Sequence, residues 1–136
     1  MPAPSVTHTN CIIQIADHIS SKWGISRNLI LGDVPKKIGS VRTNVPKIGS
    51  SYPDVFYKDK AYLFIGEAKA SREDFEGSNQ FDDYIKEMSS SKFHNKAIIT
   101  ILIVSTVKPL HEHIEITLKH KYPEFKNNIE VISIYE

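Results

Sequence analysis

The hydrophobic and polar positions along the chain predict three helices. Isoleucine and alanine residues at helical spacing predict a first helix over residues 8–23, ended by Gly24. A start that resembles a capping box, with Ser71 and Asp74, predicts a second helix over residues 71–90, and Gly77 is a weak point that can break it in two. A third helix is predicted over residues 109–120, opened by a proline.

Short apolar or alternating stretches predict the strands of one sheet. Residues 97–105 are apolar on both faces of a strand, as expected in the middle of a sheet. Further strands are predicted at residues 25–31, 52–57, 61–68 and 129–135, and residues 58–60 form the polar turn of a hairpin. A right-handed parallel crossover joins the last two strands. The order predicts an α/β fold over residues 1–136, a single domain in which helices flank a mixed central sheet.

A segment rich in glycine, proline, lysine and serine, about residues 32–51, interrupts the regular elements. It holds two near copies of a short unit, VPKKIGS at 34–40 and VPKIGS at 45–50, which predict a hairpin or paired turns around a strand at 40–44. From Lys22 to Lys47 the charged residues are six bases and one acid, a segregation that attracts a polyanion. The alternative is a solvated basic loop. The candidate DNA contacts are Lys36, Lys37, Arg42 and Lys47.

The composition is that of an ordinary soluble globular protein, with 40% hydrophobic and 24% charged residues. The longest apolar stretch, residues 97–104, is too short to span a bilayer, and the first ten residues show no signal-peptide pattern. Cys11 is the sole cysteine, which excludes an internal disulfide and a cysteine-based zinc site. We therefore expect a cytoplasmic protein without a membrane partner.

Two acids and a lysine are predicted to converge at the open end of the hairpin. Asp54 lies near the start of its first strand and Glu67 near the end of its second, so they come opposite each other or one diagonal step apart. Side chains alternate along a strand, so Glu67 and Lys69 point to the same face. Asp54, Glu67 and Lys69 therefore form the candidate active centre.

Carboxylates this close repel each other, and a hard divalent cation resolves the conflict. Mg²⁺ typically accepts one or two protein carboxylates and keeps its other positions for water and substrate phosphate. Its candidate ligands are Asp54, Glu67 and the backbone carbonyl of Ala68, and Mn²⁺ is expected to substitute. The metal would acidify a bound water, and Lys69 would orient that water or stabilise charge on the phosphate. These groups suit hydrolysis of a phosphodiester.

The residues Pro53-Asp54 and Gly66-Glu67-Ala68-Lys69, joined by a strand-turn-strand, resemble the PD-(D/E)XK motif of restriction-endonuclease-like nucleases. The resemblance covers about residues 52–88. It implies an α-β-β-β-α-β core, here with one further helix and strand, and Mg²⁺-dependent cleavage of DNA. It also implies that Asp54 and Glu67 are metal ligands and that Lys69 is the catalytic lysine.

Two further positions bear on this resemblance. Gln80 and Tyr84 are similar to the Gln-x-x-x-Tyr element of RecB-type nucleases, and residues four apart share a helix face, so both can reach the active-site strand.

Many members of the family carry a glutamate on the first helix that helps bind metal. Here no glutamate precedes Glu67, and Asp17 is the nearest substitute.

The sequence leaves three functions open. The first is a metal-dependent DNA endonuclease, restriction-like or junction-resolving, which we expect to be a homodimer or higher symmetric oligomer because cutting both strands needs two active centres. The second is a catalytically inactive DNA-binding module on the same fold. The third is a protein-interaction domain with no nucleic-acid role. A purely structural alternative for the motif residues is that Asp54 caps a turn and Glu67 and Lys69 form a surface pair at a strand end.

Overall fold

Five strands and four α-helices make up most of the computed structural model, which describes residues 6–32 and 44–134. Its strands are β1 (Leu31–Gly32), β2 (Val55–Lys58), β3 (Tyr62–Lys69), β4 (Ile99–Val107) and β5 (Ile129–Ile134). Its helices are α1 (Val6–Trp23), α2 (Arg72–Glu76), α3 (Gln80–His94) and α4 (His111–Lys121). Short 3-10 helices occur at Arg27–Leu29, Lys108–Leu110 and Pro123–Asn128.

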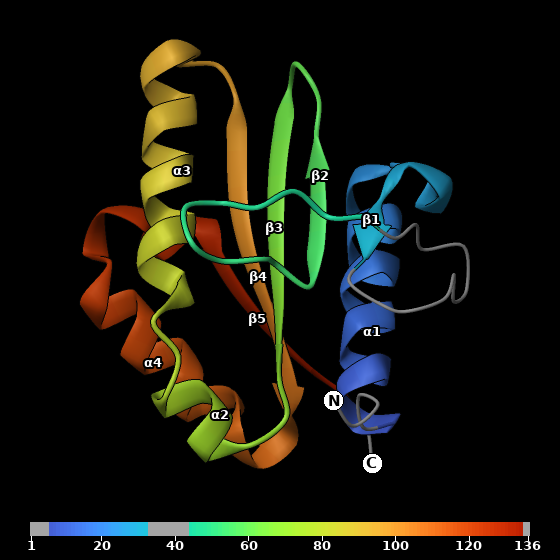
Figure 1. The fold of residues 1–136 in the computed structure, drawn as a ribbon, viewed down its shortest axis with the longest axis vertical. Coiled ribbons are helices and arrows are strands. Elements are labelled where there is room, and N and C mark those ends of the chain that lie inside the picture. The colour runs from blue at the N-terminus through green and yellow to red at the C-terminus, as the bar shows by residue number, and fades with distance from the viewer. Residues whose placement is uncertain (1–5, 33–43, 135–136) are drawn as a thin grey trace.

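The strands form one mixed sheet in the order β1-β2-β3-β4-β5. The pairs β1–β2 and β2–β3 are antiparallel, whereas β3–β4 and β4–β5 are parallel. Helix α1 lies on one side of the sheet, and α3 and α4 lie on the other (Figure 1). The predicted α/β class, with helices on both faces of a mixed sheet, is confirmed.

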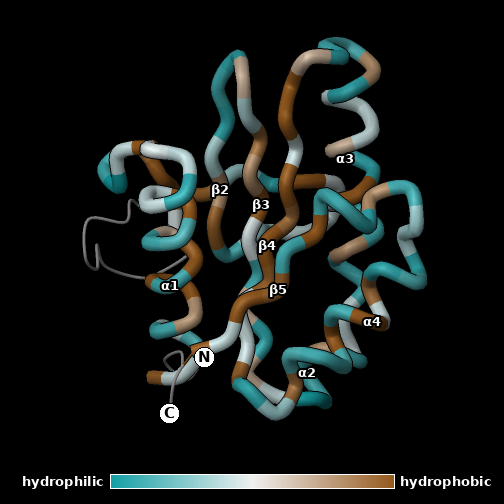
Figure 2. The backbone as a smooth tube through the Cα atoms, turned by 180° about the vertical axis from the view of Figure 1, so that it is seen from behind, coloured by the Kyte–Doolittle hydropathy of each residue, from teal (hydrophilic) through white to brown (hydrophobic). Residues whose placement is uncertain are grey.

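Each face of the sheet has its own apolar core, and hydrophobic residues concentrate along the central strands (Figure 2). On one face Phe64 of β3 belongs to a cluster with Ile12 and Ile15 of α1. Gly66 allows this close approach, because a Cβ at that position would lie 2.8 Å from Cγ2 of Ile15. On the other face Leu63 belongs to the cluster that α3 and α4 complete. Strand β3 is therefore covered on both sides and forms a rigid support for the residues at its end.

Three elements differ from the sequence prediction. The strand predicted at residues 25–31 is a 3-10 turn followed by the two-residue strand β1, because the amide of Leu29 donates to the Ser26 carbonyl at 3.0 Å. The helix predicted over residues 71–90 is broken at Gly77, as its sequence suggested, and its second piece continues to His94. The helix predicted from Pro109 starts as a 3-10 turn and becomes α-helical at His111.

The basic segment is described in part. Its first near copy, and most of the strand predicted at 40–44, lie outside the described residues. Ile48 of the second copy forms an isolated antiparallel bridge with Ser51, the residue after the copy, around a tight turn. Among the described helices, none combines the length and the apolar character that crossing a bilayer requires.

Candidate active site

Asp54 and Glu67 come from neighbouring strands and meet at one end of the β2–β3 ladder. The register pairs Val55 with Gly66, and the Asp54 amide donates to the Gly66 carbonyl at 3.0 Å. One step further along this antiparallel register, Asp54 comes opposite Glu67. Asp54 Oδ2 accepts a hydrogen bond from the Ala68 amide at 2.8 Å. The hairpin therefore fixes the Asp54 carboxylate beside the carboxyl end of β3.

The Glu67 side chain is buried, with 2% of the residue exposed. Tyr84 of α3 donates its hydroxyl to Glu67 Oε1 at 2.5 Å, and Lys69 Nζ lies 3.6 Å from Oε2. Burial and the neighbouring Asp54 charge raise the pKa of Glu67 well above its usual range, against the opposite effects of Lys69 and Tyr84. The Asp54 charge is therefore close enough to disfavour ionisation of Glu67.

Groups from three elements hold Lys69 in place. Its Nζ donates to Gln80 Oε1 of α3 at 2.9 Å and lies 3.7 Å from Asp74 Oδ1 of α2. Thr106 of β4 donates its hydroxyl to the Lys69 carbonyl at 2.6 Å. Because Lys69 is only 4% exposed, its amine lies at the floor of the site and not on the outer surface.

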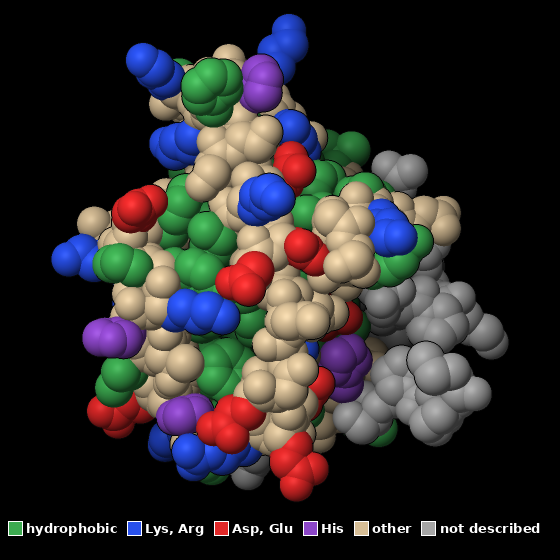
Figure 3. Space-filling model, turned by 60° about the vertical axis from the view of Figure 1, so that its left-hand side comes forward, with side chains coloured by type: hydrophobic (Ala, Val, Ile, Leu, Met, Phe, Trp, Pro, Cys, Tyr) green, Lys and Arg blue, Asp and Glu red, His purple; other side chains and the backbone are tan. Residues whose placement is uncertain are grey.

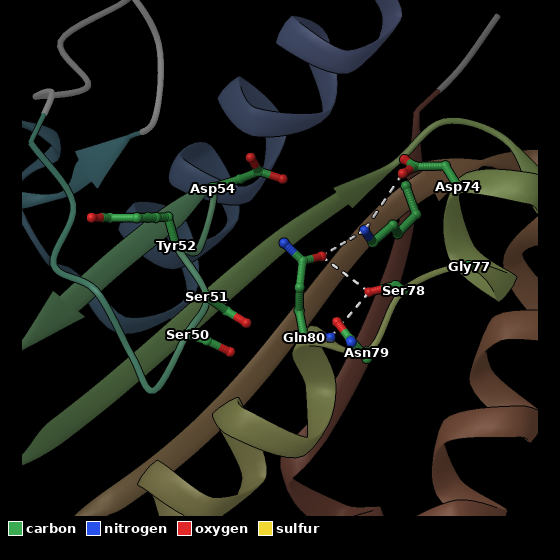
Figure 4. Close-up of a pocket in the computed structure, with 10 residues that line it drawn as sticks. Ser50, Ser51, Tyr52, Asp54, Asp74, Gly77, Ser78, Asn79 and Gln80 are labelled. Atoms are coloured by element: carbon green, nitrogen blue, oxygen red, sulfur yellow. Dashed lines mark hydrogen bonds and ion pairs between the residues drawn. The ribbon is translucent and has the colours of Figure 1, made fainter.

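An open cleft of about 550 Å³ lies over these groups (Figure 4). One wall is the start of α3 with the residues before it, where Ser78 donates its hydroxyl to Gln80 Oε1 at 3.0 Å. In Figure 4 dashed lines join Gln80 and Asp74 to the Lys69 amine between them, and Asp54 lies to one side of these groups. The lining residues are Ser50, Ser51, Tyr52, Asp54, Lys69, Asp74, Gly77, Ser78, Asn79 and Gln80.

Asp83 of α3 anchors the turn that forms the opposite wall. Its Oδ2 accepts hydrogen bonds from the Ser51 hydroxyl at 2.6 Å, and from the Ser50 hydroxyl and amide at 3.2 and 3.3 Å. Gly49 has φ +61°, and a Cβ there would lie 2.7 Å from the Asp83 carboxylate, so glycine is needed for both reasons. The sequence analysis missed Asp83, although it lies between Gln80 and Tyr84.

His8, in the first turn of α1, is a second residue that the sequence analysis missed. Its Nε2 lies 3.5 Å from Asp54 Oδ1, and the hydrogen bond with Asp54 raises the pKa of the imidazole against the effect of burial. No motif marks His8 in the sequence, because its position beside Asp54 depends on how α1 packs against β3. Asp74 was likewise considered only as part of a capping box, in which Ser71 is the N-cap and its Oγ accepts a hydrogen bond from the Asp74 amide at 3.1 Å.

Asp17 lies apart from this group of residues. Its Oδ1 pairs with Arg27 Nη1 at 3.0 Å. Asp17 is also about 13 Å farther along the helix axis than His8, at 1.5 Å per residue. The first turn of α1, and not its middle, is therefore the part that reaches Asp54.

One of the four predicted DNA contacts falls in the described part of the chain. Lys47 is exposed, and its Nζ lies 6.0 Å from the ring centroid of Tyr52, which lines the cleft. Lys47 is therefore close to the cleft rim. The other three, Lys36, Lys37 and Arg42, lie outside the described residues.

The chemistry of the two acids fits a hard divalent cation. The described residues contain no group of three His, Cys, Asp or Glu side chains arranged to hold a metal ion. Mg²⁺ and similar ions, however, need only one or two protein carboxylates and complete their shell with water and phosphate. A cation at Asp54 and Glu67 would offset the repulsion that raises the pKa of Glu67. Ala68 follows Glu67 in the chain, and its amide donates a hydrogen bond to Asp54. That the Ala68 carbonyl is a metal ligand stays a prediction.

The arrangement as a whole combines two facing acids, a buried amine and an open cleft that can admit a phosphate group. Such a set of groups is found at sites of metal-assisted hydrolysis. No protein family model, no curated protein and no solved structure matches this chain. Its function therefore has to be inferred from the geometry of the site.

Proposed function

We propose that the protein is a metal-dependent DNA endonuclease of the PD-(D/E)XK type, which hydrolyses phosphodiester bonds with Mg²⁺ or Mn²⁺. The observation that carries the proposal is the convergence of Asp54, Glu67 and Lys69 at the end of β3. Two buried acids beside an amine cost folding free energy, so their retention favours a functional role. The element order supports it, because α1, β1–β3, α2–α3 and β4 follow the order α-β-β-β-α-β, and α4 and β5 are appended.

Five polar side chains of the site would have a role in this reaction. A bound Mg²⁺ would acidify a coordinated water and polarise the scissile phosphate. Asp54 and Glu67 would hold the ion, and Lys69 would stabilise the charge on the phosphate oxygens or orient the water. Gln80 and Tyr84 fix the side chains of Lys69 and Glu67 through their hydrogen bonds.

A catalytically inactive DNA-binding module on the same fold is the second candidate function. One observation favours it: the acid available on the first helix, Asp17, pairs with Arg27 and does not face Asp54. This alternative requires salt-sensitive DNA binding without cleavage under any divalent metal.

A cleavage assay distinguishes the two candidates. Linear, circular, single-stranded and branched DNA are each incubated with Mg²⁺, Mn²⁺ or chelator. We expect cleavage with metal and none with chelator. Asp54→Asn, Glu67→Gln and Lys69→Met should each lower the rate by about 10²–10³-fold, the usual effect of removing one group that stabilises the transition state.

The matched controls are exposed residues of the same types outside the cleft, Asp82→Asn, Glu76→Gln and Lys126→Met. These variants should cleave at the wild-type rate. Full activity of Lys69→Met would contradict the proposal, and DNA binding without cleavage under every metal would favour the inactive module. Sedimentation of the same samples tests the proposed homodimer.

A further inference from the structure

We propose that the end of the molecule opposite the cleft is a second nucleic-acid-binding surface, one that takes an unpaired strand. It combines the end of α3, the loop after it and the β2–β3 turn, and we call it the α3 tip. It lies at the other end of β3 from Lys69, a separation of roughly 23 Å for a strand of this length. The residues that define the α3 tip are Lys58, Lys60, Lys92, Phe93, His94 and Lys96.

The α3 tip displays an aromatic ring to solvent. Phe93 is 82% exposed, more than any other large hydrophobic residue in the described part of the chain. Its ring meets that of His94 edge-on, with centroids 5.4 Å apart. A phenylalanine this exposed contributes little to the core, but its face is free to stack on a base.

Four lysines accompany this ring. Lys92 and Lys96 flank Phe93 along the chain, and Lys58 and Lys60 lie on the β2–β3 turn. Asn95 joins the two segments by donating from Nδ2 to the Lys60 carbonyl at 3.1 Å. In residues 6–32 and 44–134, none of these four lysines takes part in an ion pair. Their charges are therefore available to a polyanion.

The acid closest to these lysines in the sequence is bound by its own neighbours. Asp59 accepts hydrogen bonds from the Tyr57 hydroxyl at 2.5 Å and from the amides of Ala61 and Tyr62 at 2.7 and 2.8 Å. Figure 3 shows Lys and Arg side chains surrounding a hydrophobic side chain and a histidine at the top of the view, over the end of α3. Asp59 keeps its negative charge, and Glu87 lines the same hollow as Lys58 and Lys60. The four lysines outnumber these two acids, so the α3 tip presents net positive charge beside an exposed ring.

This combination fits a nucleic acid strand better than a lipid surface. Stacking needs one exposed ring with cations that follow the phosphates, whereas membrane binding needs a broad apolar face, which Phe93 alone does not make. In a closed duplex the base faces are covered by neighbouring bases, so a stacking ring selects an unpaired strand. The choice of nucleic acid over an acidic protein rests on the proposed function. A substrate that reaches both surfaces would carry a single-stranded end or branch.

Binding of a labelled oligonucleotide in chelator, measured by fluorescence anisotropy, tests this inference without cleavage. Phe93→Ala should weaken binding of an unstructured single strand about tenfold and leave binding of a blunt-ended duplex unchanged. Replacing the four lysines of the α3 tip with glutamine should weaken binding of the single strand. It should also reduce the slope of log K against log salt by about 0.7 for each phosphate that the protein no longer neutralises.

Matched controls come from the surface around α4. Ile116 is 59% exposed, and Lys119 and Lys126 line a separate groove, so Ile116→Ala and Lys119→Gln/Lys126→Gln should bind like the wild type. Wild-type single-strand affinity of Phe93→Ala would overturn the inference. Phe93-dependent binding to anionic vesicles, with none to the oligonucleotide, would do the same. Phe93-dependent DNA binding in a protein that cleaves nothing would uphold the α3 tip and reject the proposed enzyme.

Discussion

Glu67 is the residue around which the site is built. Its carboxyl group is buried beside Asp54, accepts a hydrogen bond from the Tyr84 hydroxyl and forms an ion pair with the Lys69 amine. Because burial is the largest cause of its raised pKa, ionising this group costs folding free energy when no cation is bound. The metal-free protein should therefore be less stable at neutral pH than the same fold with a neutral side chain at this position.

In chelator, the free energy of unfolding should fall as the pH rises through the raised pKa of Glu67. The folded protein binds this proton more tightly than the unfolded chain. The stability that the proton contributes is thus complete below the usual glutamate range and disappears as the folded pKa is passed. Denaturant titrations at several pH values measure the effect. Glu67→Gln should remove this part of the pH dependence, whereas Glu76→Gln, an exposed control, should retain it. If the free energy of unfolding depends on pH in the same way in the wild type and in Glu67→Gln, burying this charge does not lower the stability of the fold.

The first two turns of α3 organise the site at the scale of elements. Gln80 and Tyr84, one turn apart, bind Lys69 and Glu67. Asp83 holds the turn on the other wall of the cleft through Ser50 and Ser51. One short helical segment therefore connects the amine, the buried acid and the rim that leads back to the basic segment.

Asp83→Ala should release this turn and raise KM for DNA more than it lowers kcat, because the change affects the cleft wall and not the acids. Removing these hydrogen bonds should also lower the free energy of unfolding. Asp82→Ala is the matched control, since Asp82 faces Tyr122 and Lys121 on the α4 side. Steady-state kinetics measures the change in KM and kcat, and limited proteolysis measures the release of the turn. Equal KM values for Asp83→Ala and Asp82→Ala would show that the turn takes no part in substrate binding.

The elements with strong periodicity could be predicted from the sequence, and those fixed by local polar contacts could not. The buried run of β4 and the apolar stripe of α1 were placed within a few residues of their ends. Residues 25–31 were predicted as a strand because four of the seven are apolar, but Arg27–Leu29 form a turn in which the Ser26 carbonyl accepts from the Leu29 amide. Arg27 also reaches back to Asp17, a contact that no local pattern shows.

At the scale of the whole molecule, two surfaces lie at opposite ends of β3. The cleft with Asp54 and Lys69 is at its carboxyl end, and the α3 tip is at its amino end. The juxtaposition of Asp54 and Glu67 could be predicted because a hairpin is local, and its register brings the two residues opposite each other. His8 could not be predicted, because its place beside Asp54 depends on the packing of α1 across the sheet.

The proposed function requires that Asp54 and Glu67 together bind one hard cation. A crystal structure of the protein grown with Mn²⁺, with anomalous scattering collected at the metal edge, shows whether they do. We predict a single strong anomalous peak bridging the two carboxylates, with Lys69 Nζ beside the ion's open positions, and disappearance of that peak in Asp54→Asn. A manganese-soaked crystal with no peak there, or with the two carboxylates turned away from each other, would contradict the claim.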